Sequence, residues 1–286
     1  MLGAIEAGGT KFVCAVSDND LKNIKKLSIP TTTPEETFEK VFEFFDGYAL
    51  DAIGIGSFGP IDVNKESKTY GYITTTPKAG WGHTDFIGQM KERYDVPMSW
   101  TTDVNAAAYG ELKQGAAAGK QSCLYLTVGT GIGGGAVVNG EVLEGFGHPE
   151  MGHILVRLHE KDNYEGNCPY HNNCLEGLAA GPAIEKRYNQ KAQYLDKDSK
   201  AWDIEAYYLA QALVSYTLTL SPETIILGGG VMKQNQLFPL IRDHFTRLLN
   251  NYVSTPDLND YIVSPKLKDD AGITGCLLLA RKELTS

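Results

Sequence analysis

The sequence predicts an α/β fold in which one supersecondary unit occurs twice. Residues 2–16 have the pattern of an apolar strand, a turn that contains Gly and Thr, and a returning strand. Residues 123–138 repeat that order, and amphipathic helical stretches follow in both halves. Repetition of a whole unit, with no short-period repeat and no low-complexity linker, indicates an internal duplication. We place the seam between the halves in the small-residue stretch 115–122.

The first half predicts strands and helices in a regular order. Strands are expected at residues 2–7, 11–16, 51–56 and 97–102, and helices at residues 33–45 and 104–115. Thr33 can cap the first helix, with Pro34 at its first position and Glu36 completing a capping box. One face of this helix carries an apolar stripe, formed by Phe38, Val41, Phe42 and Phe45.

The second half predicts the same kinds of elements. Strands are expected at residues 123–128, 134–138, 141–143 and 224–227, and helices at residues 179–189, 202–220, 237–249 and 273–283. Asn139 and Gly140 stand between two of these strands, and Asn-Gly is a strong signal for a hairpin turn because both residue types accept positive φ.

Composition and charge exclude several classes of function. The 286 residues are 42% hydrophobic and 21% charged, which suits one large or two medium globular domains. The formal net charge of −9 argues against a nucleic-acid partner, because phosphate backbones attract basic surfaces. No run approaches the roughly 20 apolar residues that span a bilayer, and the N-terminus lacks a signal-peptide pattern. We therefore expect a cytoplasmic protein without a membrane partner.

One turn between strands has the composition of a phosphate-binding loop. It consists of Gly8, Gly9, Thr10 and Lys11, and Glu6 precedes it. Glycines let the backbone approach a phosphate, whose oxygens accept hydrogen bonds from N–H groups and from a Thr hydroxyl. Glu6 could hold Mg²⁺ directly or through water. For this segment alone, an ordinary hairpin turn with a solvated Lys is the alternative.

A second turn, formed by Gly129, Thr130 and Gly131, has the same context of strand, turn and strand. It precedes no helix and lacks the Lys of a P-loop, so it matches neither that motif nor the dinucleotide fingerprint. Its position as the counterpart of the first turn indicates that the two turns grip a triphosphate.

A third glycine-rich segment follows an apolar strand of the second half. It consists of Gly228, Gly229 and Gly230. Three glycines would let a flat ligand such as adenine approach the backbone closely. A tight connection between strand and helix is the alternative.

Asp103 stands where a strand ends and a helix begins. An isolated Asp at this place is commonly the N-cap of the helix. The functional alternative makes Asp103 the base that accepts the proton of a substrate hydroxyl. Phosphoryl transfer needs such a carboxylate within hydrogen-bond reach of the nucleophile.

A later segment has the spacing of metal ligands. Cys168, His171 and Cys174 lie three residues apart, and two of the five cysteines are thereby close together. With one more His, either His153 or His159, they make a Cys₂His₂ set suited to tetrahedral Zn²⁺. The predicted zinc is structural, because four protein ligands leave no open position. The alternative is a loop with unrelated thiols.

The same segment carries polar groups for a substrate. A rigid zinc loop could hold Glu150, His153 and Glu176 around a polar molecule, because the residues around a metal site fix one another's orientation. The sequence therefore predicts a substrate site beside the metal.

Together these segments resemble the ROK family of sugar kinases, repressors and open reading frames, over nearly the whole chain. The family's D-x-G-G-T-K segment corresponds to residues 6–11, its second phosphate segment to residues 129–134, and its E-x-G-H signature to residues 150–153. Its C-x-C-G-x-x-G-C-x-E zinc motif is altered at residues 168–176 to C-P-Y-H-N-N-C-L-E. That form is similar to the bacterial zinc-containing fructokinases.

The resemblance implies an actin-like fold, in which two ribonuclease H-like lobes close over an interlobe cleft. Residues 1–115 would form the smaller N-terminal lobe, completed by a C-terminal helix at residues 272–286. Residues 116–271 would form the larger C-terminal lobe, which carries the zinc loop.

The resemblance also implies roles for individual residues. Asp103 matches the catalytic base and a sugar contact, and Gly59 lies in the G-x-x-G-P turn that lines the sugar pocket. Glu150, His153 and Glu176 match ligands of the sugar hydroxyls. His153 also matches the fourth zinc ligand, which favours it over His159. The nucleotide contacts correspond to Gly8, Gly9, Thr10, Lys11, Gly129, Thr130, Gly131, Pro182, Gly228, Gly229 and Gly230.

Two positions depart from the family pattern. Glu6 replaces the usual Asp, which adds a methylene at a position that faces a metal. Thr102 replaces the Asn that precedes the catalytic Asp and contacts the sugar in many glucokinases. The second departure argues against a preference for glucose and fits a ketose better.

The function that the resemblance implies is phosphorylation of the 6-hydroxyl of D-fructose, with ATP and Mg²⁺. A mannokinase, a glucokinase or an N-acetylhexosamine kinase of the same family is the alternative. A sugar-responsive transcriptional repressor is the alternative from a different class, but such proteins carry an N-terminal helix-turn-helix domain, for which we expect no room before Glu6. The family further suggests a homodimer.

Overall fold

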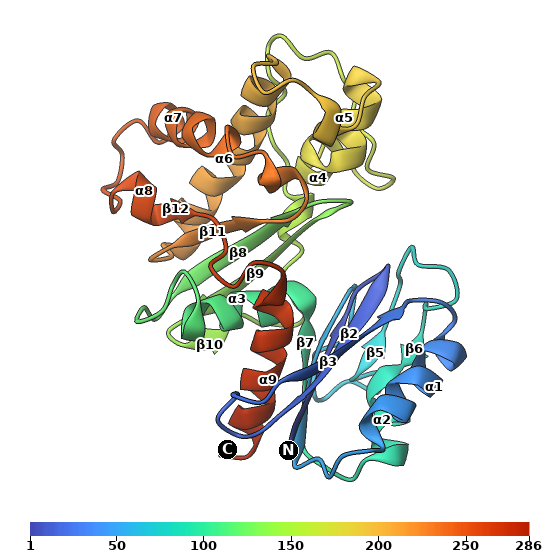
Figure 1. The fold of residues 1–286 in the computed structure, drawn as a ribbon. Coiled ribbons are helices and arrows are strands. Elements are labelled where there is room, and N and C mark those ends of the chain that lie inside the picture. Colours follow the sequence, from blue (N-terminus) through green and yellow to red (C-terminus); the bar gives the residue numbers. More distant parts are fainter. Residues whose placement is uncertain (286) are drawn as a thin grey trace. The chain divides into compact units, whose positions relative to one another are not determined.

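The computed structural model describes residues 1–285, and its contacts divide the chain into two compact α/β units (Figure 1). The first unit comprises Met1–Gly115, Val142–Pro149 and the segment from Asp269 onward. The second comprises Ala116–Glu141 and Glu150–Lys268. Residues 142–149, which we had expected in the second half, thus belong to the first unit. Residue 286 of the expected C-terminal helix lies outside the described residues.

Each unit contains a five-stranded sheet with the same plan. The first sheet has the order β3-β2-β1-β4-β7, and its strands are β1 (Leu2–Ala7), β2 (Lys11–Ser17), β3 (Lys25–Pro30), β4 (Ala52–Ser57) and β7 (Met98–Thr102). The second has the order β10-β9-β8-β11-β12, and its strands are β8 (Cys123–Val128), β9 (Ile132–Val138), β10 (Glu141–Val142), β11 (Ile225–Gly228) and β12 (Ile262–Val263). In both sheets the central strand is antiparallel to its hairpin partner and parallel to its other neighbour. This correspondence confirms the predicted duplication of an α/β unit.

The helices are distributed over both units. The first unit contains α1 (Pro34–Phe45), α2 (Phe86–Arg93), α3 (Asp103–Gln114) and α9 (Ala271–Glu283), with a small sheet of β5 (Tyr72–Ile73) and β6 (Thr84–Asp85). The second contains α4 (Leu175–Ala179), α5 (Gly181–Tyr188), α6 (Ala201–Leu220), α7 (Leu237–Leu249), α8 (Leu258–Tyr261) and the one-turn 3-10 helix η1 (Met151–His153). The elements β3, β5, β6, α2, α8 and β12 were not predicted from the sequence.

The helix that we predicted at residues 179–189 is confirmed as α5, which begins two residues later, whereas the short helix α4 before it was not predicted. Ala180, between α4 and α5, has an extended backbone with φ −70° and ψ 158°. Pro182 lies in the first turn of α5. A proline lacks an N–H donor and clashes with the preceding turn, so it begins a helix and cannot continue one.

The two faces of the first sheet differ, and β4 shows why. Ile53 and Ile55 belong to the aromatic core formed with α1 and α2. On the other face, a Cβ added at Gly54 would lie 1.9 Å from the carbonyl oxygen of Cys276, in α9. A Cβ added at Gly56 would lie 2.9 Å from that of Ala106, in α3. Because these glycines have no side chain, α9 and α3 pack closely on this face, and Figure 1 shows α1 and α2 on the opposite one.

The start of α1 follows the sequence prediction. Thr33 is the N-cap and its side chain accepts a hydrogen bond from the N–H of Glu36. Three members of the apolar stripe, Phe38, Val41 and Phe45, are buried. The helix therefore covers the sheet with the face that its periodicity indicated.

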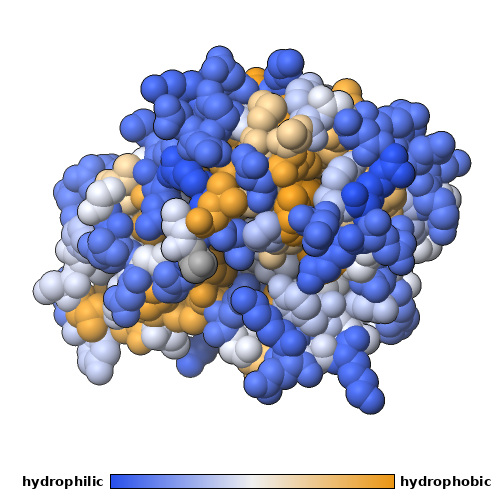
Figure 2. All heavy atoms as spheres, turned by 90° about the horizontal axis from the view of Figure 1, so that it is seen from below, coloured by the Kyte–Doolittle hydropathy of each residue, from blue (hydrophilic) through white to orange (hydrophobic). Residues whose placement is uncertain are grey.

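The face of the molecule drawn in Figure 2 is predominantly polar. Figure 2 shows one face of the molecule, on which hydrophilic side chains cover most of the area and hydrophobic ones show between them. Within residues 1–285, no helix has both the length and the apolar character needed to cross a membrane.

Candidate active site and metal site

The first Gly-Thr turn joins β1 to β2 and is held by its neighbours. The N–H of Gly8 donates to the carbonyl oxygen of Lys11 at 2.9 Å, and a Cβ on Gly8 would come within 2.8 Å of that oxygen. Thr31, which follows β3, donates its hydroxyl to the carbonyl of Gly8 at 2.7 Å. Gly9, Thr10 and Lys11 are exposed. The turn is thus fixed at its base and accessible at its tip, as a phosphate loop requires.

Glu6 lies at the end of β1, beside the N-terminus of α9. The N–H of Ile273 donates to its carboxylate, and a Cβ on Gly272 would lie 2.5 Å from its Cδ. Burial, and after it the nearby carboxylate of Asp103, raise the pKa of Glu6 to about 7 against the opposing effect of Lys11. The structure therefore brings two predicted site carboxylates, Glu6 and Asp103, close together within the first unit. A divalent cation would neutralise their repulsion.

Asp103 is the first residue of α3 and not its N-cap. The cap is Thr102, whose hydroxyl accepts a hydrogen bond from the N–H of Asn105 at 3.1 Å. Asp103 accepts one from the N–H of Val104 through Oδ1 at 2.8 Å. The carboxylate thus lies at the N-terminal, positive end of a helix. The capping role that we weighed for Asp103 belongs to its neighbour.

The turn at Gly59 contacts His148, a residue to which the sequence analysis assigned no role. Nε2 of His148 accepts a hydrogen bond from the N–H of Ile61 at 3.0 Å, and a Cβ on Gly59 would lie 3.3 Å from Cε1 of that ring. The neighbouring Glu144 accepts a hydrogen bond from the hydroxyl of Thr101 at 3.1 Å. Residues 142–149 therefore line the Gly59 turn and the end of β7. The only sequence signal for this role of His148 was its position within a segment of predicted site residues.

The three predicted nucleotide segments of the second unit lie next to one another. The carbonyl of Gly129 accepts a hydrogen bond from the N–H of Gly181 at 2.8 Å. A Cβ on Gly129 would lie 3.8 Å from the nitrogen of Gly230. Gly229 has φ +92°, and a Cβ there would lie 2.4 Å from the carbonyl oxygen of Val128. Glycine is therefore required at this position both by conformation and by close approach.

Glu176, in α4, connects the second Gly-Thr turn with the metal-ligand segment. Its Oε2 accepts a hydrogen bond from the N–H of Ile132 at 2.9 Å, and a Cβ on Gly131 would lie 2.6 Å from that oxygen. Its Oε1 lies 3.9 Å from Nε2 of His153. Two of the predicted sugar ligands, Glu176 and His153, are thus neighbours. The third, Glu150, precedes η1, and its carbonyl accepts a hydrogen bond from the N–H of His153 at 3.0 Å.

Four side chains converge as the zinc hypothesis expects. The ligand atoms of His153, Cys168, His171 and Cys174 all lie within 4.8 Å of one another. Nδ1 of His153 lies 3.6 Å from both thiol sulfurs, and Nδ1 of His171 lies 3.8 Å from that of Cys168. Bond lengths of about 2.3 Å to sulfur and 2.0–2.1 Å to nitrogen place two tetrahedral zinc ligands about 3.6 Å apart. The donor set and its spacing therefore fit a tetrahedral zinc ion.

The geometry distinguishes between the two candidates for the fourth ligand. His159 lies outside this group, with its ring against Tyr207 at a centroid distance of 4.8 Å. Its Nδ1 accepts a hydrogen bond from the N–H of Lys161 at 3.1 Å. Of the two, only His153 reaches the thiols of Cys168 and Cys174.

The segment between His153 and Leu175, residues 154–174, is called the metal loop below. Its last ligands stand on a tight hairpin, in which the N–H of Asn172 donates to the carbonyl of Cys168 at 3.0 Å. A Cβ on Gly177 would lie 1.8 Å from the carbonyl oxygen of Asn172, so α4 packs directly against this hairpin. Burial raises the pKa of the Cys174 thiol to about 11. A metal that binds here would replace its proton.

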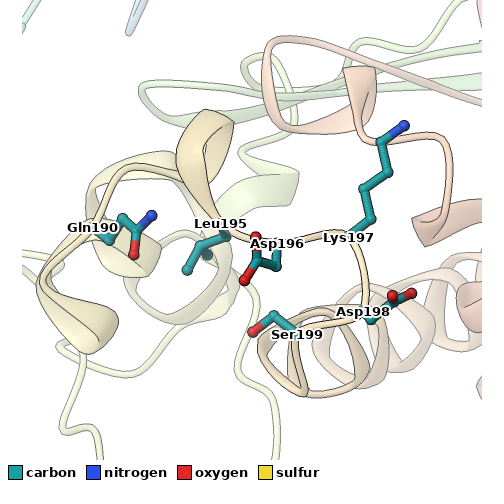
Figure 3. Close-up of a pocket in the computed structure, with 6 residues that line it drawn as sticks. All are labelled: Gln190, Leu195, Asp196, Lys197, Asp198 and Ser199. Atoms are coloured by element: carbon teal, nitrogen blue, oxygen red, sulfur yellow. The ribbon is translucent and has the colours of Figure 1, made fainter.

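A hollow elsewhere in the second unit contains none of the predicted site residues. It follows α5, has a volume of about 510 Å³, and is lined by Gln190, Leu195, Asp196, Lys197, Asp198 and Ser199. Figure 3 shows that it is formed by a surface loop, with Lys197 directed away from Gln190. It brings together no set of groups with an evident chemical task.

Comparison with known proteins agrees with the geometry. The profile of the ROK family matches residues 2–283. The chain is 50% identical to a fructokinase from Pediococcus pentosaceus, over 99% of both chains. It is 46% identical to a fructokinase from Streptococcus mutans, over 99% of this chain and 98% of that one. Among solved structures, a ROK hexokinase from Thermus thermophilus superimposes with a TM-score of 0.83 at 29% identity, covering 100% and 99% of the two chains.

Proposed function

The chain belongs to the ROK family, and we propose that it is a fructokinase, which transfers the terminal phosphoryl group of ATP to the 6-hydroxyl of D-fructose. The observation that carries this proposal is the identity of 46–50% to proteins named fructokinase over nearly their full length. The fold class, with its duplicated α/β unit, is the one on which hexose kinases of this family are built.

In the proposed reaction Asp103 accepts the proton of the sugar hydroxyl as the phosphoryl group arrives. Asp103 stands at the start of α3, which fixes the position of its carboxylate. The neighbouring Thr102 caps the helix, so the carboxylate of Asp103 is not needed for capping. Phosphoryl transfer needs little beyond such positioning and electrostatic stabilisation. Mg²⁺ would supply the neutralising charge for the phosphates, and Glu6 is the residue of this chain that would hold it.

The nucleotide would be held by the two Gly-Thr turns and the third glycine segment. Gly8, Gly9, Thr10 and Lys11 would contact phosphates from the first unit. In the second unit the hydrogen bond between Gly129 and Gly181, and the proximity of Gly230, support a shared nucleotide site. The residues proposed for it are Gly129, Thr130, Gly131, Pro182, Gly228, Gly229 and Gly230.

The sugar would be held by Gly59, Asp103, Glu150, His153 and Glu176. The contact of Glu176 with His153 supports a common role for these two side chains. The hydroxyl of Thr102 caps α3. This supports a sugar contact at position 102 that differs from the contact an Asn would make there. The proposal therefore favours fructose over glucose, mannose and N-acetylated hexosamines.

The metal would be a structural Zn²⁺ held by His153, Cys168, His171 and Cys174. It would supply a rigid cross-link and no catalytic step, because all four positions of the tetrahedron are taken by protein. With Nδ1 of His153 on the metal side, Nε2 carries the ring's proton and can donate to Glu176 or to a sugar hydroxyl.

We further propose that the two units correspond to the two lobes of the family fold. We also propose that the protein acts in the cytoplasm, forms a homodimer and has no nucleic-acid partner. Cysteines that are free and buried fit a reducing compartment. Sedimentation of the purified protein would test the dimer.

The position of the new phosphate tests the proposed reaction. Fructose and Mg-ATP are incubated with the protein, and the product is identified by its ¹³C–³¹P couplings. We expect coupling at C6 and at its neighbour C5, and none at C1 or C2. Phosphorylation at C1, or hydrolysis of ATP without a sugar phosphate, would contradict the proposed reaction.

A further inference from the structure

Arg187, in α5, forms an ion pair in the interior of the second unit. Its Nε lies 3.1 Å from Oδ2 of Asp162, a residue of the metal loop, and the exposed fractions of the two side chains are 6% and 4%. Three aromatic rings surround the guanidinium, with centroids 4.7–5.8 Å from Cζ, and they belong to Tyr164, Tyr188 and Tyr208. Ion pairs withdrawn from water in this way often contribute little net stability, whereas removal of one partner leaves a buried charge uncompensated.

The ion pair joins the metal loop to the helices on either side of it. Nη2 of Arg187 donates to the carbonyl of Leu178, in α4, at 2.7 Å. The hydroxyl of Tyr208, in α6, donates to Oδ2 of Asp162 at 2.7 Å and accepts from the N–H of His159 at 3.1 Å. The middle of the metal loop is therefore tied to α6, and the helix that follows the loop is tied to α5.

Glu205 lies near this cluster but forms no hydrogen bond with Arg187. Burial raises the pKa of Glu205 well above its usual range, although the charge of Arg187 lowers it. Within residues 1–285 its two oxygens have no hydrogen-bond partner. The carboxylate that pairs with Arg187 is that of Asp162, so the metal loop supplies the partner of this buried charge.

We propose that Asp162, Arg187 and Tyr208 form a buried anchor that holds the metal loop in place and thereby slows the loss of the metal. Three ligands stand at or after Cys168 and the fourth is His153, so a separation of these two parts would break up the ligand set. The anchored residues lie between them in the chain. The three side chains are positioning residues, and this inference rests on the metal site proposed above.

A pair of matched substitutions tests the anchor. Tyr208→Phe keeps the ring beside Arg187 and removes only the hydroxyl. Tyr261→Phe is the control, because Tyr261 is equally buried and its hydroxyl bonds to Thr217, which is also in α6, at a distance of 3.0 Å. The purified proteins are compared for zinc content, for the rate of zinc transfer to a chromogenic chelator, and for Tm. Tryptic cleavage after Lys161, in the metal loop, is a readout that does not depend on the metal assay.

We expect both variants to lower Tm by a similar amount, while only Tyr208→Phe releases zinc faster, by about tenfold. Cleavage after Lys161 should accelerate in the same variant. Equal rates of release and of cleavage in the two variants would overturn the anchor and leave the metal site standing. A wild-type protein that carries no zinc would instead overturn the metal site.

Arg187→Lys provides a second test at the centre of the cluster. Lysine keeps the charge but lacks the planar group that reaches both Asp162 and Leu178. We expect zinc release at least as fast as in Tyr208→Phe, in a protein whose circular dichroism matches the wild type. A folded Arg187→Lys protein that keeps its zinc as long as the wild type would contradict the proposal.

Discussion

Nε2 of His153 lies 3.9 Å from Oε1 of Glu176, while Nδ1 of the same ring faces the sulfurs of Cys168 and Cys174 at 3.6 Å. One imidazole thus borders a metal site on one side and a carboxylate on the other. A metal bound to Nδ1 would fix the ring and place the proton on Nε2. The proposed metal and the proposed sugar ligand Glu176 are therefore coupled through a single side chain.

Replacing Glu176 with Gln tests its role toward the sugar. The amide oxygen can still accept from the N–H of Ile132, but the negative charge is lost. We expect the KM for fructose to rise about tenfold, because hydrogen bonds to charged groups are worth roughly 1.5–3 kcal/mol. Zinc content and the KM for ATP should stay near wild type. Glu185→Gln, an exposed change in α5, is the control, and an unchanged fructose KM in Glu176→Gln would refute the assignment.

Replacing Asp103 with Asn tests the proposed base. Asn has nearly the same shape but accepts no proton, so we expect kcat to fall by at least about 100-fold while the Kd for fructose changes little. Asp85→Asn is the matched control, since Asp85 also stands at a helix start and caps α2. Steady-state kinetics and calorimetric titration with fructose give the two quantities. Turnover near wild type in Asp103→Asn would mean that another group takes the proton.

Replacing Cys174 with Ala tests the metal site. Loss of one of four ligands should abolish retention of the zinc and lower Tm by on the order of 10 °C. Cys14→Ala removes another buried thiol, in β2 of the other unit, and should keep about one zinc per chain. Metal analysis of protein purified without added zinc gives the content. Equal metal content in the two variants would count against the site.

The pKa of Glu6 predicts how stability varies with pH. The folded value of about 7 lies above the usual 4.5, so the folded state binds this proton more tightly than the unfolded state does. The free energy of unfolding should therefore fall as the pH rises from about 4.5 to about 7, with a contribution from Glu6 of about 3 kcal/mol. Glu6→Gln should remove this part of the slope.

Urea unfolding at pH 5 and pH 8, in buffer without Mg²⁺, measures that contribution. Glu39→Gln, an exposed change in α1 of the same unit, is the control and should leave the slope as in the wild type. If Glu6→Gln shows the wild-type slope as well, Glu6 is not the group that takes up the proton.

Local sequence signals predicted the parts of the fold that depend on local chemistry. Certain residue types favour a small number of backbone conformations. They predicted the Gly8–Thr10 turn, the Asn139–Gly140 hairpin and the cap of α1. The hairpin residues have φ of 54° and 81°, as an Asn-Gly turn requires. Strand β3 was missed because its residues Lys25–Pro30 are mostly exposed and include two lysines, so no apolar run marks it.

The candidate site was predictable where residues of one segment carry it, and less so where distant residues meet. The spacing of Cys168, His171 and Cys174 indicated a metal, but spacing could not choose between His153 and His159. That choice depends on how residues 154–167 fold back, and Asp162 within this stretch pairs with Arg187, which is distant in sequence. The place of His148 beside Gly59 likewise depends on a long-range contact that no local pattern encodes.

The central claim is that this chain is a fructokinase, and a sugar panel tests it most directly. The purified protein is assayed with Mg-ATP and D-fructose, D-glucose, D-mannose or N-acetyl-D-mannosamine, and ADP release gives kcat/KM for each. We predict the highest value for fructose, by at least about tenfold over every other sugar. An equal or higher value for another sugar, or no turnover of fructose, would contradict the claim.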